Sequence, residues 1–272
     1  MKLQFTNGYR PRFDQISRIM QFLYSQGDSK TPTREELISA LGIPKNQVKN
    51  LNSMMVGFGL VKPLVVTLTD FGKAVAHKDP YFEKEETLWI LHYIVSSNPE
   101  WVVWYRIVNS AIPMQDRLSV DQVSDQYFSD LVIHFSERTI SEKLPKEVGA
   151  VLATYTRTEM ARLNILEQEQ EKKGTFVKAT PIDISALAFL FCILHFRDTY
   201  SPGSSALNTE NICMGENSPG RVLNIPEYQV RSMLSDLHSA ELVRLEQFAN
   251  LDQVRIPDTT TQEIVLSRIY GG

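Results

Sequence analysis

The chain has 272 residues, of which 43% are hydrophobic and 22% are charged, and its formal net charge is −4. This length and composition predict a soluble globular protein with one large domain or two ordinary ones. The acidic balance excludes a uniformly basic nucleic-acid coat and leaves a local basic patch open. With only two cysteines, Cys192 and Cys213, the chain cannot build a disulfide framework or a zinc ribbon.

The sequence gives no sign of a membrane segment. Met1 begins a polar segment of mixed charge without the apolar core of a signal peptide. The longest strongly apolar run, residues 184–193, is too short to cross a bilayer. We therefore expect a soluble cytoplasmic protein with no membrane contact.

Three helices are predicted near the amino terminus. Apolar residues at helical spacing place the first over residues 12–26, and Gly27 stops it. "TREE" is a capping-box pattern, in which Thr33 caps a second helix and Glu36 occupies its third position. Pro44 suits the first turn of a third helix, because its missing N–H would have no partner there. The side chains that this helix turns inward are Val48, Leu51 and Met55.

Two short β-rich pieces follow, over residues 60–62 and 64–68, and Thr69 or Asp70 opens a closing helix. Three helices, a hairpin and a return helix in this order are typical of a winged helix-turn-helix. The sequence therefore predicts a winged-helix domain over residues 1–78.

Residues 79–180 are predicted to form a helical middle domain. Its helices centre on residues 88–95, 101–108, 120–133 and 148–155. The charged stretch "EQEQEKKG" (167–174) is interpreted as a solvated helix end or a linker. The tryptophans could form a platform for stacked bases, but their i, i+3, i+4 spacing favours helix core, and His92 on the same stripe is expected to be a hydrogen-bonded core histidine.

Residues 181–272 are predicted to form a third domain. A buried helix over residues 182–197 precedes a turn-rich stretch, a helix over 226–242, and a hairpin over 243–256. A helix followed by a hairpin repeats the logic of the amino-terminal domain. We therefore expect a degenerate winged-helix-like unit and, for the whole chain, a mainly α fold.

The third predicted helix carries the clearest functional pattern. No Asp or Glu occurs from residue 37 to 69, whereas three lysines do, so an acidic protein carries a local charge of +3 there. Ammonium groups bind phosphates, and short polar side chains on such a helix can reach base edges. The expected phosphate contacts are Lys45, Lys49 and Lys62, and the expected base contacts are Asn46, Asn50 and Ser53. The alternative is a solvated surface helix on a module that contacts only proteins.

Nothing in the sequence supports catalysis or a bound cofactor. No nucleophile elbow, paired carboxylates or dinucleotide fingerprint occurs, and no histidines stand at metal-ligand spacing. "GENSPGR" (215–221) superficially resembles a phosphate loop but lacks the Lys-Ser/Thr pair, so we interpret it as a structured turn in which Arg221 could contact an anion. Cys213, among polar neighbours, could be an exposed thiol or a sulfur carrier, although an inert role is favoured; Cys192 is expected to pack in a core.

The stretch "DPYFEKEETLWILHYIVSSNPEWVVWYRIVN" resembles a bacterial family of uncharacterised proteins, domain of unknown function family 4007. The family pattern is approximately D-P-Y-x-E-D-x-x-T-L-W-L-L-H, followed by a tryptophan-rich helix that ends in F-N. The matching residues are Asp79, Pro80, Tyr81, Glu83, Thr87, Leu88, Trp89, Leu91, His92, Trp104 and Asn109. Upstream, "LGIPKNQVKNL" is similar to the family's L-G-V-G-K-N-M-V, and downstream "NSPGR" resembles its S-P-G segment, so the resemblance covers nearly the whole chain. One departure is that "FTNGYRPRF" lacks the histidine and glutamate of the family's F-x-G-H-E-x-F opening.

The resemblance implies a genomic context. Genes of this family often accompany phosphoadenosine-phosphosulfate-reductase-like and cysteine-desulfurase genes of DNA phosphorothioation and related phage-defence loci. It thus implies a DNA-binding accessory protein, without catalysis, that positions such a partner enzyme on duplex DNA. The alternatives are an adaptor that docks the enzyme without meeting DNA, and a transcriptional regulator of the locus. The sequence leaves the oligomeric state open.

Overall fold

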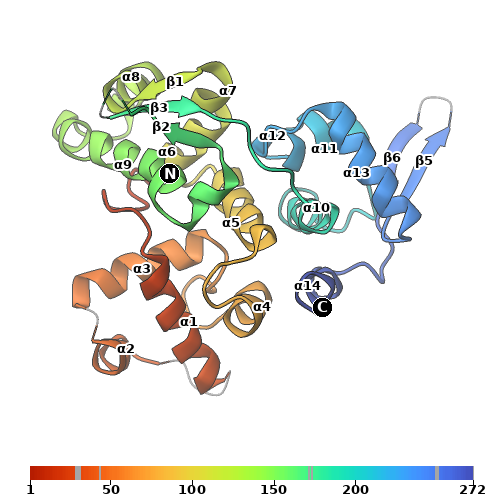
Figure 1. Ribbon diagram of the computed structural model, residues 1–272, viewed down its shortest axis with the longest axis horizontal. Coiled ribbons are helices and arrows are strands. Elements are labelled where there is room, and N and C mark those ends of the chain that lie inside the picture. The colour runs from red at the N-terminus through yellow and green to blue at the C-terminus, as the bar shows by residue number, and fades with distance from the viewer. Residues whose placement is uncertain (28–31, 43, 171, 173, 249–250, 272) are drawn as a thin grey trace.

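The computed structural model describes residues 1–27, 32–42, 44–170, 172, 174–248 and 251–271. The chain is mainly helical, with two small three-stranded sheets. Figure 1 shows the amino-terminal helices and the first sheet on one side of the molecule, and the second sheet with its helices on the other. No helix in these residues is long and apolar enough to cross a membrane.

The described residues of the amino-terminal unit form the helices α1 (Phe13–Gln26), α2 (Arg34–Leu41), α3 (Lys45–Gly57) and α4 (Asp70–Lys78). The predicted capping box is confirmed, because the Thr33 hydroxyl accepts from the backbone N–H of Glu36 while the Glu36 side chain accepts from that of Thr33. Gly42 ends α2 in the left-handed region at φ 64°. Local signals therefore set the ends of these helices correctly.

The predicted wing differs from a regular hairpin. Among the described residues, its two pieces meet at one isolated bridge, between Val61 and Leu68, rather than in two strands. Leu64 lies at φ 72° and is fully exposed, so this side chain anchors no strand face. The segment is a loop whose two ends are joined by this single β-bridge.

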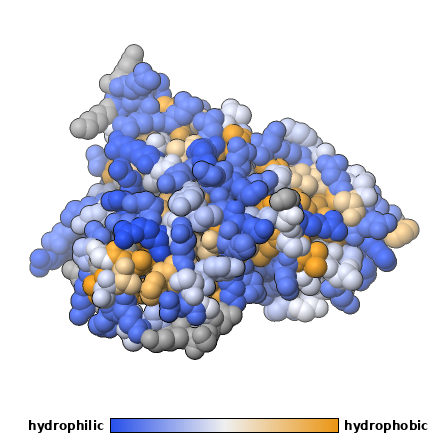
Figure 2. All heavy atoms as spheres, turned by 60° about the horizontal axis from the view of Figure 1, so that its bottom comes forward, coloured by the Kyte–Doolittle hydropathy of each residue, from blue (hydrophilic) through white to orange (hydrophobic). Residues whose placement is uncertain are grey.

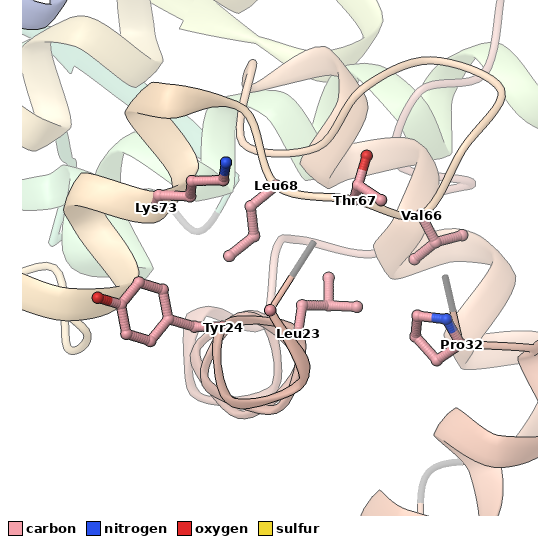
Figure 3. A pocket seen from close by; sticks show the side chains of 8 residues that line it. Leu23, Tyr24, Pro32, Val66, Thr67, Leu68 and Lys73 are labelled. Atoms are coloured by element: carbon pink, nitrogen blue, oxygen red, sulfur yellow. The ribbon is translucent and has the colours of Figure 1, made fainter. Parts of the chain in front are cut away.

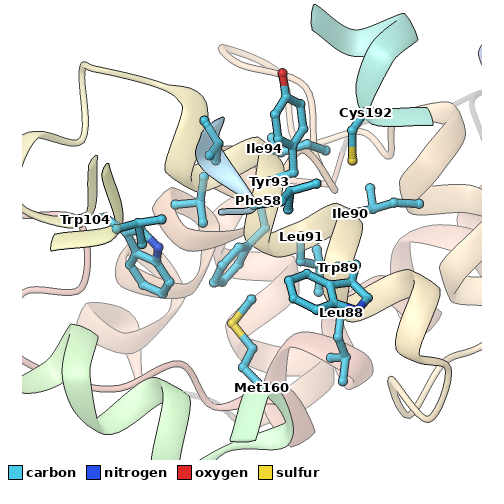
Figure 4. Close-up of a cluster of buried hydrophobic side chains, with 14 of the residues drawn as sticks. Phe58, Leu88, Trp89, Ile90, Leu91, Tyr93, Ile94, Trp104, Met160 and Cys192 are labelled. Atoms are coloured by element: carbon cyan, nitrogen blue, oxygen red, sulfur yellow. The ribbon is translucent and has the colours of Figure 1, made fainter. Parts of the chain in front are cut away.

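The middle unit is organised around α5 (Glu85–Ser97), whose side chains from Thr87 onward are all buried. Figure 4 shows α5 side chains surrounded by others from distant segments, among them Phe58, Trp104 and Met160. Trp89 and Trp104 are 3% and 0% exposed. The tryptophans therefore form core, as their spacing predicts, and offer no stacking platform.

His92 belongs to a buried hydrogen-bond network. Its Nδ1 lies 2.7 Å from the hydroxyl of Tyr155, and Trp104 Nε1 donates to the same hydroxyl over 2.9 Å. Burial lowers the pKa of His92 to about 3, so the ring is neutral at physiological pH. The prediction of a core histidine is confirmed.

In the rest of the middle unit, the structure differs from the prediction at residues 120–133 and at residues 167–174. Its elements are α6 (Val102–Arg106), a π-helical turn η1 (Ile107–Ala111), α7 (Ile112–Met114), β1 (Arg117–Ser119), α8 (Val120–Tyr127), a 3-10 turn η2 (Ser129–Ile133), α9 (Glu137–Arg157), a 3-10 turn η3 (Glu159–Leu163), β2 (Leu166–Gln168) and β3 (Thr175–Lys178). The helix predicted over 120–133 breaks at Phe128, which is buried at φ −132°. The stretch 167–174 was predicted to be a helix end or a linker, but it begins within β2, in a sheet of order β1-β3-β2; residues 171 and 173 lie outside the described residues.

Pairing between β2 and β3 sets the conformation of the described residues in this stretch. Thr175 and Phe176 bury their side chains, and the Arg117 guanidinium lies 3.1 Å from the Glu169 carboxylate. The backbone N–H of Glu169 donates to the carbonyl of Thr175 over 3.0 Å and so continues the antiparallel pairing of β2 with β3, which composition alone does not predict.

The carboxy-terminal unit contains α10 (Ala186–Tyr200), β4 (Ala206–Asn208), α11 (Thr209–Met214), α12 (Pro219–Val222), α13 (Glu227–Ser239), β5 (Arg244–Phe248), β6 (Leu251–Arg255) and α14 (Gln262–Tyr270). The predicted buried helix, the later helix and the hairpin are confirmed, and the sheet order is β4-β6-β5. The sequence did not predict α14. This helix returns to α10 and α4, where the hydroxyl of Tyr270 lies 2.7 Å from that of Thr87.

Candidate nucleic-acid interface

The charge of the chain is distributed unevenly. Residues 1–78 contain 11 Lys and Arg against five Asp and Glu, a net charge of +6. Residues 79–180 and 181–272 each carry −5, and no lysine follows Lys178. An acidic molecule therefore concentrates its positive potential on the unit that contains α3.

The outer face of α3 presents the predicted cationic side chains. Lys45 and Lys49 are exposed, Ser53 is half-buried, and Lys62 is exposed in the loop that follows. The opposite face packs inward as predicted, through Val48, Leu51 and Met55. The side chain of Asn46 lies outside the described residues. The structure thus leaves the predicted lysines on the surface.

Asn50 faces a different partner from the one that the sequence suggests. Its Nδ2 donates to the backbone carbonyl of Thr6 over 2.9 Å, and its Oδ1 accepts from the side chain of Asn7. Both groups of the amide are therefore engaged with the amino-terminal loop, residues 5–10, which lies beside α3. Asn50 positions this loop.

Glu147 on α9 holds the same loop from the other side. Its carboxylate accepts the backbone N–H groups of Phe5, Thr6 and Gly8 over 2.7, 2.6 and 3.1 Å. The side chain is fully buried, and burial raises its pKa, while the N–H donors oppose this shift because they stabilise the charged form. Gly8 lies at φ 78°, a conformation that costs a glycine little. The loop is consequently fixed at both ends of its turn.

A groove of about 970 Å³ opens between the amino-terminal loop, α3 and α9. Small residues of α9, Gly149, Ala150 and Ala153, line it. No Asp or Glu is among its lining residues in the described parts of the chain. The cationic residues that line it are Arg10, Arg12, Lys49 and Lys146. The groove is therefore a cationic channel directly beside the outer face of α3.

These four cations differ in their partners. The Arg12 guanidinium lies 2.9 Å from the Asp14 carboxylate, and both side chains are more than half exposed. Within the described residues, Arg10, Lys49 and Lys146 make no side-chain hydrogen bond or ion pair, so an anion could bind them without displacing a protein partner. The sequence identified only Lys49 as part of this site. Residues 1–13 contain no Asp or Glu, and this pattern could have indicated Arg10 and Arg12 as members of the site. No sequence pattern indicated Lys146.

A second, smaller cavity of about 340 Å³ lies between α1, the loop after α3, and α4. Figure 3 shows Leu23 and Leu68 in the middle of the cavity, with Tyr24 of α1 and Lys73 of α4 on one side and Val66 on the other. Figure 2, in which the bottom of the Figure 1 view comes forward, shows a mostly hydrophilic surface with small apolar patches. Such patches are ordinary on a soluble protein. The mainly apolar lining gives this cavity no phosphate-binding character.

The "SPGR" segment forms α12, as a structured turn. The Ser218 hydroxyl accepts from the backbone N–H of Arg221, and Pro219 occupies the first helical position. The Arg221 side chain is exposed, but α12 packs beside α10, α11 and α5, far from α3 in Figure 1. The structure therefore does not bring Arg221 to the lysines of α3.

Cys213 is not an exposed thiol. It is 1% exposed in α11, and burial raises its pKa, which disfavours the reactive thiolate. We expect that a thiol reagent such as Ellman's reagent labels neither Cys213 nor Cys192 in the native protein and labels both in guanidinium. Rapid native labelling that Cys213→Ser abolishes would revive the sulfur-carrier hypothesis.

These features define a mainly helical protein with a cationic groove beside an exposed helix. The chain belongs to a family described as "Protein of unknown function (DUF4007)", whose model matches residues 7–270. No curated protein matches the chain.

Two solved structures share the fold. A structure of SspB with bound magnesium has a TM-score of 0.76 at 17% identity, over 97% of this chain and 86% of SspB. A second SspB structure has a TM-score of 0.75 at 16% identity, with the same coverage. Among the residues that the structure describes, no group of three or more His, Cys, Asp or Glu could hold a metal ion.

Proposed function

We propose that this protein is a non-catalytic, DNA-binding accessory protein of a DNA sulfur-modification (phosphorothioation) or related phage-defence system. It would position a reductase-like or cysteine-desulfurase partner on duplex DNA. The observation that supports DNA binding is the charge distribution: a unit of +6, whose sequence contains no Asp or Glu from residue 37 to 69, in a chain of net charge −4. The sulfur-modification context rests on the family resemblance.

In this proposal the outer face of α3 meets the major groove, as the recognition helix of a winged helix does. Lys45, Lys49 and Lys62 contact phosphates and set the register of the complex. Ser53 and Asn46 probe base edges, and Asn50 acts indirectly by fixing the amino-terminal loop. The incomplete wing makes Lys62, rather than a β-hairpin, the contact to the flanking backbone.

The two acidic units are left for protein partners. Each carries −5, so away from the side of α9 that lines the groove they repel a polyanion and attract a basic protein surface. One molecule could therefore hold DNA through α3 while an enzyme docks elsewhere.

Duplex binding is tested by its salt dependence. Lys49→Ala combined with Lys62→Ala is expected to weaken binding of a random 20-bp duplex and to reduce the slope of log K against log salt by about 1.8, because about 0.9 is lost for each phosphate contact. Lys84→Ala, an exposed lysine of the middle unit, is the matched control and should leave the slope unchanged. Fluorescence anisotropy from 50 to 200 mM salt measures both.

Other outcomes identify the alternatives. Absence of duplex binding at low salt would favour the adaptor, and one operator bound far more tightly than random DNA would favour the regulator. Conversion of supercoiled plasmid to nicked circles by the pure protein with magnesium would contradict the non-catalytic role.

A further inference from the structure

An exposed aromatic ring lies at the cationic groove. Tyr9 lines the groove and is 72% exposed, next to Arg10, which also lines it. The other unpaired cations of the groove are Lys49 from α3 and Lys146 from α9. An aromatic ring within a cationic trough is the combination with which proteins bind unpaired nucleic-acid strands, since each base has a face that can stack.

The loop that carries Tyr9 is fixed before any ligand arrives. The backbone N–H of Tyr9 donates to the Thr6 carbonyl over 3.1 Å, closing a tight turn. Glu147 and Asn50 hold the preceding residues of the same turn. The ring is thus presented on an ordered backbone, and binding would pay little entropy for ordering the loop.

We infer that this groove binds single-stranded DNA, with one base stacked on Tyr9 and the adjoining phosphates held by Arg10, Lys49 and Lys146. The inference rests on the proposed function in taking DNA as the polymer. A paired base has both faces covered by its neighbours, whereas an unpaired base can leave the stack and cover the tyrosine ring. The outer face of α3 serves the duplex, and the adjacent groove serves a strand that has left it.

The experiment compares three labelled ligands: a thymidine 10-mer, an abasic 10-mer with the same phosphates, and a 20-bp duplex. Tyr9→Leu is expected to lower the affinity for the thymidine strand roughly tenfold, which is the effect of losing one base–aromatic stack. The affinities for the abasic strand and the duplex should not change. Tyr9→Phe should retain wild-type affinity for all three. Because Tyr9 is largely exposed, neither substitution disturbs the core.

The positions of the cations are tested in the same assay. Lys146→Gln should lower the affinity for the thymidine strand and for the abasic strand equally. Lys62→Gln should lower only the affinity for the duplex, because Lys62 does not line the groove. An equal loss on the thymidine and abasic strands in Tyr9→Leu would overturn the stacking role. If the protein binds the duplex but not the thymidine strand, the groove inference fails while the proposed function stands. If it binds the thymidine strand but not the duplex, the groove inference stands and the proposed duplex binding fails.

Discussion

Glu147→Ala is expected to lower the free energy of unfolding by about 4 kcal/mol. The substitution leaves the backbone N–H groups of Phe5, Thr6 and Gly8 without their acceptor, and each unsatisfied buried donor costs about 1–3 kcal/mol. The cavity left by the carboxylate adds to this cost, while water that enters it offsets a part. Urea unfolding monitored by circular dichroism measures the shift in midpoint at unchanged slope.

A carboxylate of the same helix provides the control. Glu142 is half exposed and pairs with Arg138 across one turn at 2.9 Å, so Glu142→Ala should cost less than about 0.5 kcal/mol. If the two substitutions cost the same, Glu147 does not anchor the amino-terminal loop. Because that loop carries Tyr9 and Arg10, Glu147→Ala should also weaken thymidine-strand binding at temperatures where the protein stays folded.

Gly220→Ala is expected to destabilise the protein by about 3 kcal/mol. A Cβ at this position of α12 would lie 2.4 Å from the carbonyl oxygen of Cys213 and 2.8 Å from its Cα, both backbone atoms of the adjacent helix. The two helices must separate or distort to admit the methyl group, and overpacking of this kind costs about 1–3 kcal/mol or more. The loss should be measured by thermal and urea unfolding.

A second helical glycine separates this steric effect from a general effect of glycine replacement. At Gly149 of α9 an added Cβ would meet only Val120 Cγ2, at an ordinary 3.5 Å. Gly149→Ala should therefore stabilise the protein by up to about 1 kcal/mol through helix propensity. Equal stability of the Gly220→Ala and wild-type proteins would show that α11 and α12 do not pack this closely.

Predictions from local pattern were confirmed where local interactions decide the structure. The Thr33–Glu36 capping box spans three residues, and the apolar stripe of α5 repeats within a few turns, so both are written directly in residue spacing. The same local signals failed at residues 167–174. There the charged composition suggests a helix end or a linker, but the pairing of β2 with β3 decides the conformation of the described residues.

Residue order and composition were enough to predict the mainly helical class, the family membership, the lysines on the outer face of α3, and Lys62 in the loop that follows it. The groove beside that face could not be predicted in this way, because residues far apart in the sequence form it. Glu147 reaches Thr6 across 141 positions of the chain, and Lys146 joins Arg10 in the groove for the same reason. The spacing of residues along the chain shows which side chains share one face of a helix. It does not show which two helices enclose a loop, because that depends on how the apolar faces of the helices pack in the common core.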